Sequence, residues 1–509
     1  MSGKKNFMEN EVSPKLFSKP WLMAALVAVL FIGALGIRLV DLTDLPNDFY
    51  MVRQYRSLLI ARGMYYAHLP TAPELKREIA VAQWQEQGLI EPPVMESLVA
   101  LTYHFIGEQI WVGRVYASLF WLVSGLAIWL LAKELSMWEG GIIALAYFLF
   151  LPFGVTASRA FMPDSLMTAL IAWSLWALYR WETRRTWKSA ILAGVLTGLA
   201  ILVKSVAVFP LLGAAAGLVL SRRSLKRMIT DKQTWAVAGI TALPTVIFYI
   251  YGLFIVGTLE SQFALRFFPA LLKDPTFYGR WLFIAAGIVS FAAMFLSLAG
   301  ILLFRTNAPR FLLVGTWFGY VVFGFAFPYH FITHEYYHLP LIPIVAIGLI
   351  PVADLLVRQI ARQKGWLWRA VFAGLLLFAV AMKMWEARNT LVTSDYRHEI
   401  AYWQELGQTI GYDKKIVELS GDYGDRLAYF GWVSGLLWPT TADVAVRTLA
   451  GQTQSDFASI FADRTSGKDL FVVTTPPEWE NQPELREYLT ANYPLIAQGD
   501  GYWIFNLKP

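Results

Sequence analysis

Residues 41–56 read Asp41-Leu-Thr-Asp-Leu-Pro-Asn-Asp-Phe-Tyr-Met-Val-Arg-Gln-Tyr-Arg56 and follow directly on a long apolar run, Trp21–Val40. Three carboxylates and two arginines therefore lie at the end of a segment long enough to cross a bilayer. Charge at a membrane boundary is costly unless it is paired, solvated or used. The stretch predicts an active-site loop at the membrane surface.

Composition restricts the class of protein. Of the 509 residues, 56% are hydrophobic and only 16% are charged, and the mean hydropathy is +0.47. These values exclude a soluble globular protein and predict a polytopic membrane protein. The net charge of +6 is expected in cytoplasmic loops, so it does not indicate a nucleic-acid partner. The absence of cysteine excludes disulfides, thiolate metal sites and a cysteine nucleophile.

Eleven apolar runs predict about eleven transmembrane helices: Trp21–Val40, Ile110–Leu131, Gly140–Ala157, Leu166–Leu178, Ala190–Val203, Val206–Leu220, Ala236–Gly257, Trp281–Phe304, Phe311–Phe327, Leu339–Val357 and Ala370–Met384. The first run is long and has no small-residue cleavage signal after it. We therefore interpret it as an anchor that is kept, and not as a removable signal peptide.

The basic residues predict the orientation. Lys4, Lys5, Lys15 and Lys19 precede the first run, and the loops Arg180–Lys188, Arg222–Lys232, Arg305–Arg310 and Arg358–Arg369 fall on the same side. By the positive-inside rule this side is cytoplasmic, and so is the N-terminus. The outer side then receives Asp41–Gln109, Ser158–Pro163, Thr258–Arg280, Tyr329–His338 and everything after Trp385.

Two parts of the chain are predicted. Residues 1–384 form the membrane domain, whose outer loop 41–109 carries two helical patterns, Arg53–Tyr66 and Glu74–Gln87, typical of amphipathic helices in the interface. Residues 385–509 have the composition of a soluble domain and are predicted to form a small extracytoplasmic α/β unit. Its expected helices are Tyr396–Thr409, Gln454–Ala462 and Pro483–Ala491, and its expected strands are Lys415–Ser420, Asp469–Thr475, Leu495–Gln498 and Tyr502–Asn506.

The stretch His334-Glu335-Tyr336-Tyr337-His338 matches the H-E-x-x-H pattern of zinc proteases. That mechanism needs the motif on a helix. Pro340 follows almost at once, so the next helix is expected to begin at Leu339 or Pro340, which leaves the motif in the preceding loop. We therefore favour the lining of a site or an isolated metal over a protease. Polar and aromatic residues that simply occupy a membrane interface are the alternative.

Five further residues carry charge near the predicted outer face. Asp48 has the chemistry of a general base toward a hydroxyl, and Arg53 and Arg56, one helical turn apart, have that of a phosphate site. The alternative is a set of solvated juxtamembrane charges. Asp164 begins a predicted helix, where a dipole partner is equally expected. Lys204 lies in an otherwise apolar stretch, where it needs an anion, water or a path to the interface.

These residues together resemble the GT-C glycosyltransferases related to protein O-mannosyltransferases and to the transferase that adds aminoarabinose to lipid A. The resemblance covers about Trp21 to Val357 and rests on the order and spacing of six motifs. They are Asp48 with Arg53-Gln54-Tyr55-Arg56, Glu91-Pro92-Pro93, Gly113-Arg114-Val115-Tyr116-Ala117-Ser118-Leu119-Phe120, Ala157-Ser158-Arg159 leading to Pro163-Asp164, Leu202-Val203-Lys204, and Tyr336-Tyr337-His338-Leu339-Pro340.

The resemblance implies a site at the outer membrane face. It assigns Asp48 as the base that deprotonates the acceptor, and it makes Arg53, Arg56, Arg159 and Lys204 the candidates for holding the donor phosphate. The supporting or substrate-binding candidates are Glu91, Asp164, His334, Glu335, Tyr336, Tyr337 and His338. Two departures from the family pattern leave alternatives open. Phe49 follows Asp48 where a second acid is common, so Asp44 or Glu91 could be the base, and Glu91 replaces a basic residue, so it could bind a metal with His334 or His338.

The functional hypothesis is an inverting glycosyltransferase that moves a monosaccharide from a polyprenyl-phosphate donor to a hydroxyl of a lipid, glycan or protein acceptor. Its expected location is the bacterial cytoplasmic membrane, where membrane lipids surround it. No cofactor is required by this chemistry, although a divalent metal is an open alternative. A transporter or flippase, and a polysaccharide polymerase or ligase with a diphosphate-linked donor, are the competing hypotheses.

Overall fold

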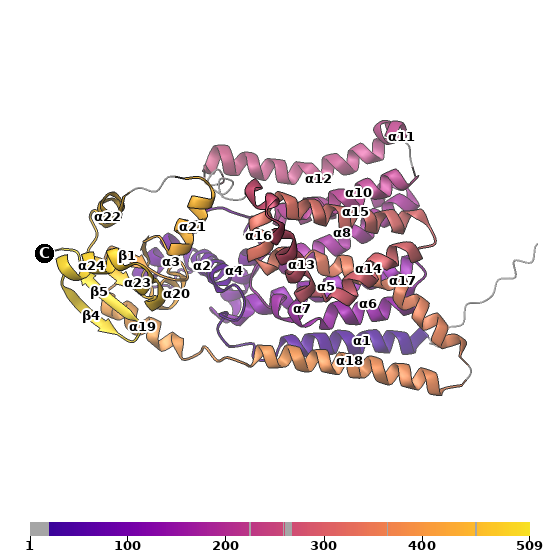
Figure 1. Cartoon of the computed structure of the whole chain (residues 1–509), viewed down its shortest axis with the longest axis horizontal. Coiled ribbons are helices and arrows are strands. Elements are labelled where there is room, and N and C mark those ends of the chain that lie inside the picture. The colour runs from indigo at the N-terminus through magenta and orange to yellow at the C-terminus, as the bar shows by residue number, and fades with distance from the viewer. Residues whose placement is uncertain are drawn as a thin grey trace, which may run out of the picture.

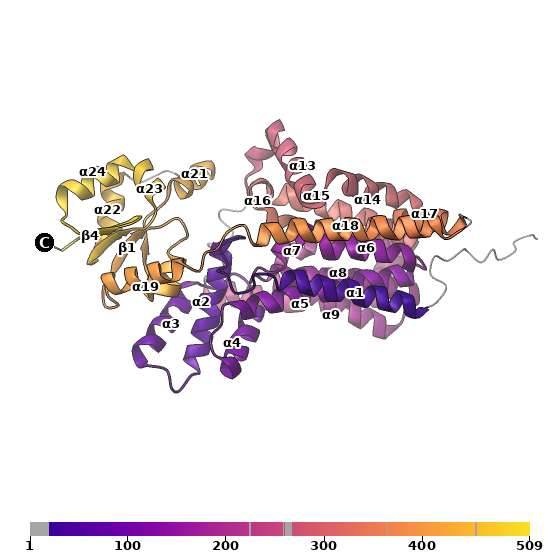
Figure 2. The same cartoon turned by 90° about the horizontal axis from the view of Figure 1, so that it is seen from below.

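The structure, a computed structural model, describes residues 20–222, 225–257, 259, 267–363, 365–452 and 456–508. The N-terminal lysines, part of the loop 258–280 and the start of the predicted helix 454–462 lie outside these residues. A long helical bundle fills one end of the molecule, and the C-terminal segment forms a separate body at the other end (Figures 1 and 2).

Six helices of the described chain are long and apolar enough to cross a membrane. They are α1 (Pro20–Arg38), α5 (Trp111–Glu134), α12 (Lys232–Ile250, continued by a π-helical turn Tyr251–Val256), α15 (Asn307–Ala326), α17 (Leu341–Arg362) and α18 (Leu367–Leu391). The pair α13 (Pro275–Val289) and α14 (Phe291–Leu303), bent by 91°, has the composition of a broken span or of a re-entrant loop, and counting it as one span gives up to seven. The remaining bundle helices are α6 (Trp138–Phe150), α7 (Pro152–Ala157), α8 (Asp164–Arg184), α9 (Trp187–Val203), α10 (Val208–Arg222), α11 (Leu225–Thr230) and α16 (Pro328–Thr333). Each predicted run contains a helix, whereas the number of eleven spans stays a prediction.

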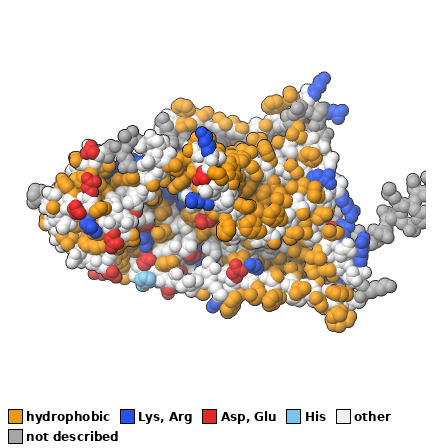
Figure 3. All heavy atoms as spheres, in the orientation of Figure 1, with side chains coloured by type: hydrophobic (Ala, Val, Ile, Leu, Met, Phe, Trp, Pro, Cys, Tyr) orange, Lys and Arg blue, Asp and Glu red, His pale blue; other side chains and the backbone are white. Residues whose placement is uncertain are grey.

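The outer surface of the bundle is apolar. Large hydrophobic side chains such as Phe254, Leu302 and Phe283 are 81%, 77% and 75% exposed, and hydrophobic atoms cover the bundle in the space-filling view (Figure 3). Such exposure in water would be prohibitive, but it is favourable in lipid. The chain is a multi-pass integral membrane protein. Lysine and arginine side chains gather at the end of the bundle farthest from the C-terminal body (Figure 3).

Two helices of the bundle, α10 and α15, are packed backbone against backbone. Each carries two glycines four residues apart, Gly213 and Gly217 on α10, and Gly315 and Gly319 on α15. A Cβ added at Gly213 would lie 2.1 Å from the carbonyl oxygen of Gly315, and one at Gly315 would lie 2.0 Å from that of Gly213. Small residues let membrane helices approach closely enough for van der Waals packing to hold them together. The four-residue spacing of these glycines is visible in the sequence.

We expect Gly315→Leu to destabilise the bundle, because its side chain has to displace the backbone of α10. Overpacking of this kind costs about 2 kcal/mol or more. Gly239→Leu is the matched control, since a Cβ at Gly239 meets nothing within 4 Å. Thermal unfolding in detergent should show a lower midpoint for Gly315→Leu and an unchanged one for Gly239→Leu. Equal midpoints would contradict the tight packing of α10 on α15.

The loop between α1 and α5 contains three helices, α2 (Met51–Ala67), α3 (Glu74–Glu86) and α4 (Val94–Ile106). The helices predicted at Arg53–Tyr66 and Glu74–Gln87 are therefore confirmed as helices. The expectation that both lie flat in the interface is wrong for α2, because residues 57–63 are all buried. It packs against α3, α4 and the C-terminal body, so tertiary contacts cover both of its faces.

The C-terminal body is an α/β unit around a five-stranded sheet in the order β2-β1-β3-β5-β4. Its strands are β1 (Ile416–Leu419), β2 (Gly435–Leu437), β3 (Leu470–Val473), β4 (Leu495–Gly499) and β5 (Tyr502–Asn506). β1 pairs in parallel with β2 and β3, while β5 is antiparallel to β3 and β4. The helices are α19 (Glu399–Ile410), α20 (Asp425–Gly431), α21 (Thr441–Leu449), α22 (Phe457–Thr465), α23 (Pro476–Asn481) and α24 (Pro483–Asn492).

This unit is attached to α2 and α3 by buried polar contacts. Arg62 donates to the Tyr429 carbonyl oxygen, pairs with Glu108 at 2.8 Å and lies 3.7 Å from the centre of the Tyr429 ring. Gln83 donates to the Ala428 carbonyl oxygen at 2.9 Å. Contacts of this kind fix the position of the C-terminal unit above the bundle.

Candidate active site

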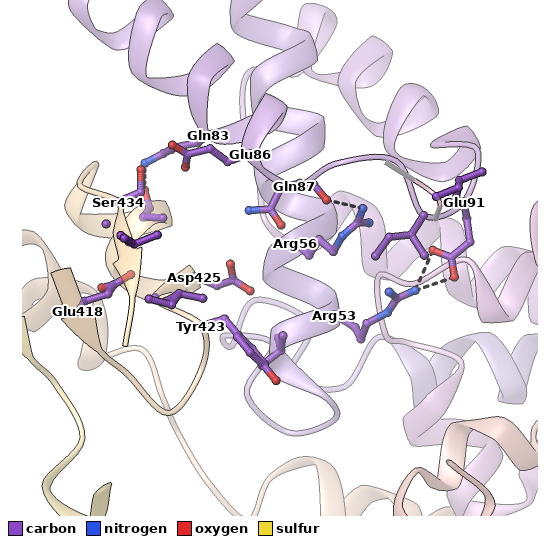
Figure 4. A pocket seen from close by; sticks show the side chains of 18 of the residues that line it. Arg53, Arg56, Gln83, Glu86, Gln87, Glu91, Glu418, Tyr423, Asp425 and Ser434 are labelled. Carbon is purple, nitrogen blue, oxygen red and sulfur yellow. Dashed lines mark hydrogen bonds and ion pairs between the residues drawn. The ribbon is translucent and has the colours of Figure 1, made fainter. Parts of the chain in front are cut away.

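A cavity of about 1250 Å³ lies between the ends of the bundle helices nearest the C-terminal unit, α2 and α3, and that unit. One wall carries cations and aromatic rings, and its main polar members are Arg53, Arg56, Glu91, Lys204, His334, Tyr336 and Tyr337. The C-terminal unit forms the opposite wall with Glu418, Tyr423 and Asp425, and Figure 4 shows these residues across from Arg53 and Arg56. Four basic residues of the same unit also line the cavity: Lys414, Lys415, Arg464 and Lys468.

Arg53 and Glu91 form the first ion pair of the cation wall. Arg53 lies in the first turn of α2, and its Nη2 donates to both carboxylate oxygens of Glu91 at 2.9 and 3.0 Å (Figure 4). Burial alone would raise the pKa of Glu91, but the positive charges of Arg53, Lys204 and Arg56 outweigh it and lower that pKa to about 2. Glu91 is therefore a permanent anion and a weak base.

Lys204 and Asp164 form the second pair. Lys204 caps the end of α9 and Asp164 begins α8, and the Lys204 ammonium donates to both carboxylate oxygens at 2.8 Å. The Lys204 Nζ also lies 4.8 Å from the centre of the Tyr336 ring. Lys204 is only 7% exposed, so a bidentate anion and an aromatic face satisfy it, and it does not snorkel toward water.

Arg56 differs from its two neighbours. Its Nη2 donates to the carbonyl oxygens of Gln87 and Gly88, both at 3.0 Å, and it has no carboxylate partner among the described residues. Burial and the nearby Arg53 charge both lower the pKa of Arg56. The wall thus holds three cations and two paired anions, which leaves one net positive charge for an anionic ligand.

The H-E-x-x-H stretch does not form a zinc-protease helix. Glu335–His338 is a short 3₁₀-helix, and α17 begins at Leu341. Both ring nitrogens of His338 are occupied, Nδ1 by the Tyr320 hydroxyl at 2.7 Å and Nε2 by the Phe331 carbonyl oxygen at 2.9 Å. Within the described parts of the chain, no three histidine, aspartate or glutamate side chains converge as a metal site would require.

Asp48 lies outside the large cavity, in an adjoining groove of about 480 Å³ lined also by Tyr50, Glu335 and apolar side chains of α7 and α13. Its Oδ1 accepts from Arg114 Nη2 at 3.1 Å, and its side chain is 25% exposed. Tyr50 separates the two spaces. Its hydroxyl bonds the Glu335 carboxylate, and its ring packs edge-on against Tyr336 at 4.6 Å.

Two other predicted or alternative residues lie away from the cavity. Arg159, proposed for the donor phosphate, is buried and donates to the Asp41 carbonyl oxygen at 2.9 Å. Asp44, the alternative base, accepts from the Tyr396 backbone amide at 2.9 Å. Both residues hold the loop 41–48 in place, and neither faces the three cations.

Sequence reasoning missed several polar residues of the site. Arg114 could have been found, because a charged residue inside an apolar helix such as Trp111–Glu134 indicates a special role. Gln83, Glu418 and Asp425 carried no such signal, since their segments read as an ordinary amphipathic helix and an ordinary α/β domain. Only the docking of the C-terminal unit places them in the cavity wall.

Comparisons with known proteins bear on the fold of the chain. A family model described as dolichyl-phosphate-mannose-protein mannosyltransferase matches residues 90–251, a segment that includes Glu91, Asp164 and Lys204. No curated protein matches the chain. The crystal structure of ArnT from Cupriavidus metallidurans bound to undecaprenyl phosphate is similar at 15% identity with a TM-score of 0.59, covering 96% of this chain and 98% of that chain. The apo structure of the same protein is similar at 14% identity with a TM-score of 0.57, covering 96% of this chain and 97% of that chain. The chain therefore has the GT-C fold.

Proposed function

We propose that the protein is an inverting glycosyltransferase that transfers a monosaccharide from a polyprenyl-phosphate donor to a hydroxyl acceptor at the outer face of a bacterial cytoplasmic membrane. The observation that carries the proposal is the wall of three cations, Arg53, Arg56 and Lys204, at the membrane end of a cavity of about 1250 Å³. A bound lipid phosphate in a structure of the same fold supports a donor of this class.

The donor phosphate would bind next to Arg56, whose charge is not neutralised by a carboxylate. The acceptor oxygen would attack the anomeric carbon as its proton passes to Asp48, and the bond from that carbon to the phosphate oxygen would break. Because Asp48 lines the adjoining groove, this step requires the reacting groups to meet past the Tyr50 side chain. The lipid phosphate leaves with the extra negative charge, and fixed cations stabilise charge where it develops. Asp48 is preferred over Glu91 as the base because nearby cations lower the pKa of Glu91 to about 2. A carboxylate with so low a pKa is a weak base.

The test is a transfer assay on detergent-purified protein with a panel of radiolabelled polyprenyl-phosphate monosaccharides and candidate lipid and glycan acceptors. Consumption of one donor with formation of a labelled product of inverted anomeric configuration would support the proposal. Consumption of a diphosphate-linked donor instead, or transport of the lipid across vesicles without transfer, would replace it with the corresponding competing function.

A chelator is expected to leave the transfer rate unchanged. A lipid phosphate is a competent leaving group, and Arg53, Arg56 and Lys204 supply the positive charge that a metal would otherwise provide. The rate is measured with and without EDTA after dialysis. A loss of more than about tenfold that added Zn²⁺ or Mg²⁺ restores would instead assign a metal to the site.

A further inference from the structure

The wall of the cavity that faces the cations is built by the C-terminal unit and α3. Glu418 lies on β1, Asp425 begins α20 and Gln83 lies in α3, and all three line the cavity. They are almost completely buried, with exposures of 1%, 5% and 1%. Figure 4 shows these side chains across the space from Arg53 and Arg56.

Two of these side chains carry a buried oxygen without a partner. Glu418 Oε2 and Gln83 Oε1 make no hydrogen bond to any described residue, although Gln83 Nε2 donates to the Ala428 carbonyl oxygen. A buried polar atom without a partner is costly, and native structures keep few of them. Buried nitrogens and hydroxyl groups elsewhere in the described chain also lack a partner, but among carboxylate and amide oxygens this holds only for Glu418 Oε2 and Gln83 Oε1. Both line the same wall, so they point to a ligand that donates hydrogen bonds there.

The backbone around Glu418 is shaped to keep its carboxyl group in this place. Gly424 has a φ of +74°, and a Cβ at this position would lie 1.7 Å from Glu418 Oε1. Neighbouring Asp422 is bound by Arg426 at 2.6 Å, whereas no cation pairs with Glu418 in the described chain. Burial raises the pKa of Glu418 well above its usual value, and the Asp422 and Asp425 carboxylates add to this effect.

We propose that Glu418, Asp425 and Gln83 form a carbohydrate subsite, in which their oxygens bind hydroxyl groups of a sugar ring. A carboxyl group that holds its proton can both donate and accept a hydrogen bond, as a sugar hydroxyl can. The cavity of about 1250 Å³ exceeds the roughly 300–1,000 Å³ of ordinary small-molecule sites, so there is room for a sugar beyond the cations. The ring is that of the donor or that of a glycan acceptor. The inference rests on the proposed function for the identity of the opposite wall, but it can be tested without a lipid phosphate.

The experiment uses the full-length protein in detergent on an array of monosaccharides and oligosaccharides. Glu418→Leu and Gln83→Leu are compared with Glu487→Leu, which replaces an exposed glutamate on α24 of the same unit. We expect the wild type to bind a defined set of sugars. Binding should fall by about tenfold or more in both cavity variants, because a site built for hydroxyls depends on its buried partners, and it should not change in the control.

Thermal unfolding of the same variants separates binding from folding. Glu418→Leu should keep or raise the unfolding midpoint, because it removes a buried carboxyl group that lacks a partner. A lower midpoint together with lost binding would assign a structural role to Glu418 and overturn the proposal. Unchanged sugar binding in both cavity variants, or no sugar bound by the wild type, would overturn it as well.

Binding of undecaprenyl phosphate is measured in parallel, so that the two proposals fail separately. Sugar binding that depends on Glu418 without any binding of the lipid phosphate would keep the subsite and reject the proposed function. Lipid binding without sugar binding would keep the proposed function and reject the subsite. A bound sugar that competes with a sugar-loaded polyprenyl phosphate identifies the donor's ring, and one that does not compete identifies the acceptor.

Discussion

Arg56→Gln is expected to lower kcat/KM for the polyprenyl-phosphate donor by about 100- to 1000-fold, the usual effect of removing one group that stabilises developing negative charge. Arg53 and Lys204 are each paired with a carboxylate, so Arg56 supplies the net positive charge of the cation wall. Gln keeps some hydrogen-bonding capacity but loses this charge. Initial rates over a range of donor concentrations, with direct binding of undecaprenyl phosphate, measure the effect.

Arg77→Gln is the matched control. Arg77 on α3 also donates to backbone carbonyl oxygens, those of Leu69, Pro70 and Ala72, but it does not line the cavity. The two variants therefore lose similar structural contacts, and their unfolding midpoints should be similar. If both lost the same activity, the loss would come from the fold of the outer helices, and the assignment of Arg56 to the donor phosphate would fail.

Asp48→Asn is expected to lower kcat by about 100- to 10,000-fold, the range for loss of a general base. The affinity for undecaprenyl phosphate should stay within about twofold of the wild type, because Asp48 is not part of the cavity with the three cations. Asn keeps the size of the side chain and can still accept from Arg114. Because Asn removes the negative charge that pairs with the buried Arg114 guanidinium, the unfolding midpoint should fall. A single-turnover experiment at saturating donor, on protein that is still folded, measures the chemical step.

Two further substitutions serve as a control and as a test of the alternative base. Asp41→Asn changes another carboxylate of the same loop, which is bound to Arg397, and it should retain full activity. Glu91→Gln changes the carboxylate that the sequence left open as an alternative base. Normal turnover in Asp48→Asn together with a loss in Glu91→Gln that is confined to kcat would move the role of the base to Glu91.

The bundle followed from the sequence more closely than the outer helices did. Lipid-facing runs such as Trp21–Val40 are uniformly apolar, so length and hydropathy alone identify them. In contrast, the pattern of Arg53–Tyr66 predicted an amphipathic helix in the interface, whereas residues 57–63 of α2 are all buried. No pattern within the helix reveals partners that come from α3, α4 and α20. The glycine contact of α10 with α15 was visible as two four-residue spacings, but the pairing of these two helices was not.

The residues of the predicted site fall into two groups, those that the structure brings together and those that it places elsewhere. Arg53, Arg56, Glu91 and Lys204 meet at one wall of the cavity, because the first turns of α2, the loop before α4 and the end of α9 come together there. Asp48 is in sequence a near neighbour of Arg53, yet the residue between the two spaces, Tyr50, has a φ of 44° and turns the chain, so Asp48 enters a separate groove. Arg159 was expected at the phosphate and instead binds the backbone of Asp41.

The sequence by itself determined the membrane class and the helical segments, because segments that lie in lipid have high local hydropathy. It also determined the set of cations available for a lipid phosphate, because an ionisable residue next to or within an apolar run is easily recognised. Only the tertiary structure decided which charges are neutralised. It paired Arg53 with Glu91 and Lys204 with Asp164, left Arg56 without a carboxylate, and brought Glu418 across from them. Such pairings join residues far apart in the chain, and their energies depend on distances and burial that no local pattern contains.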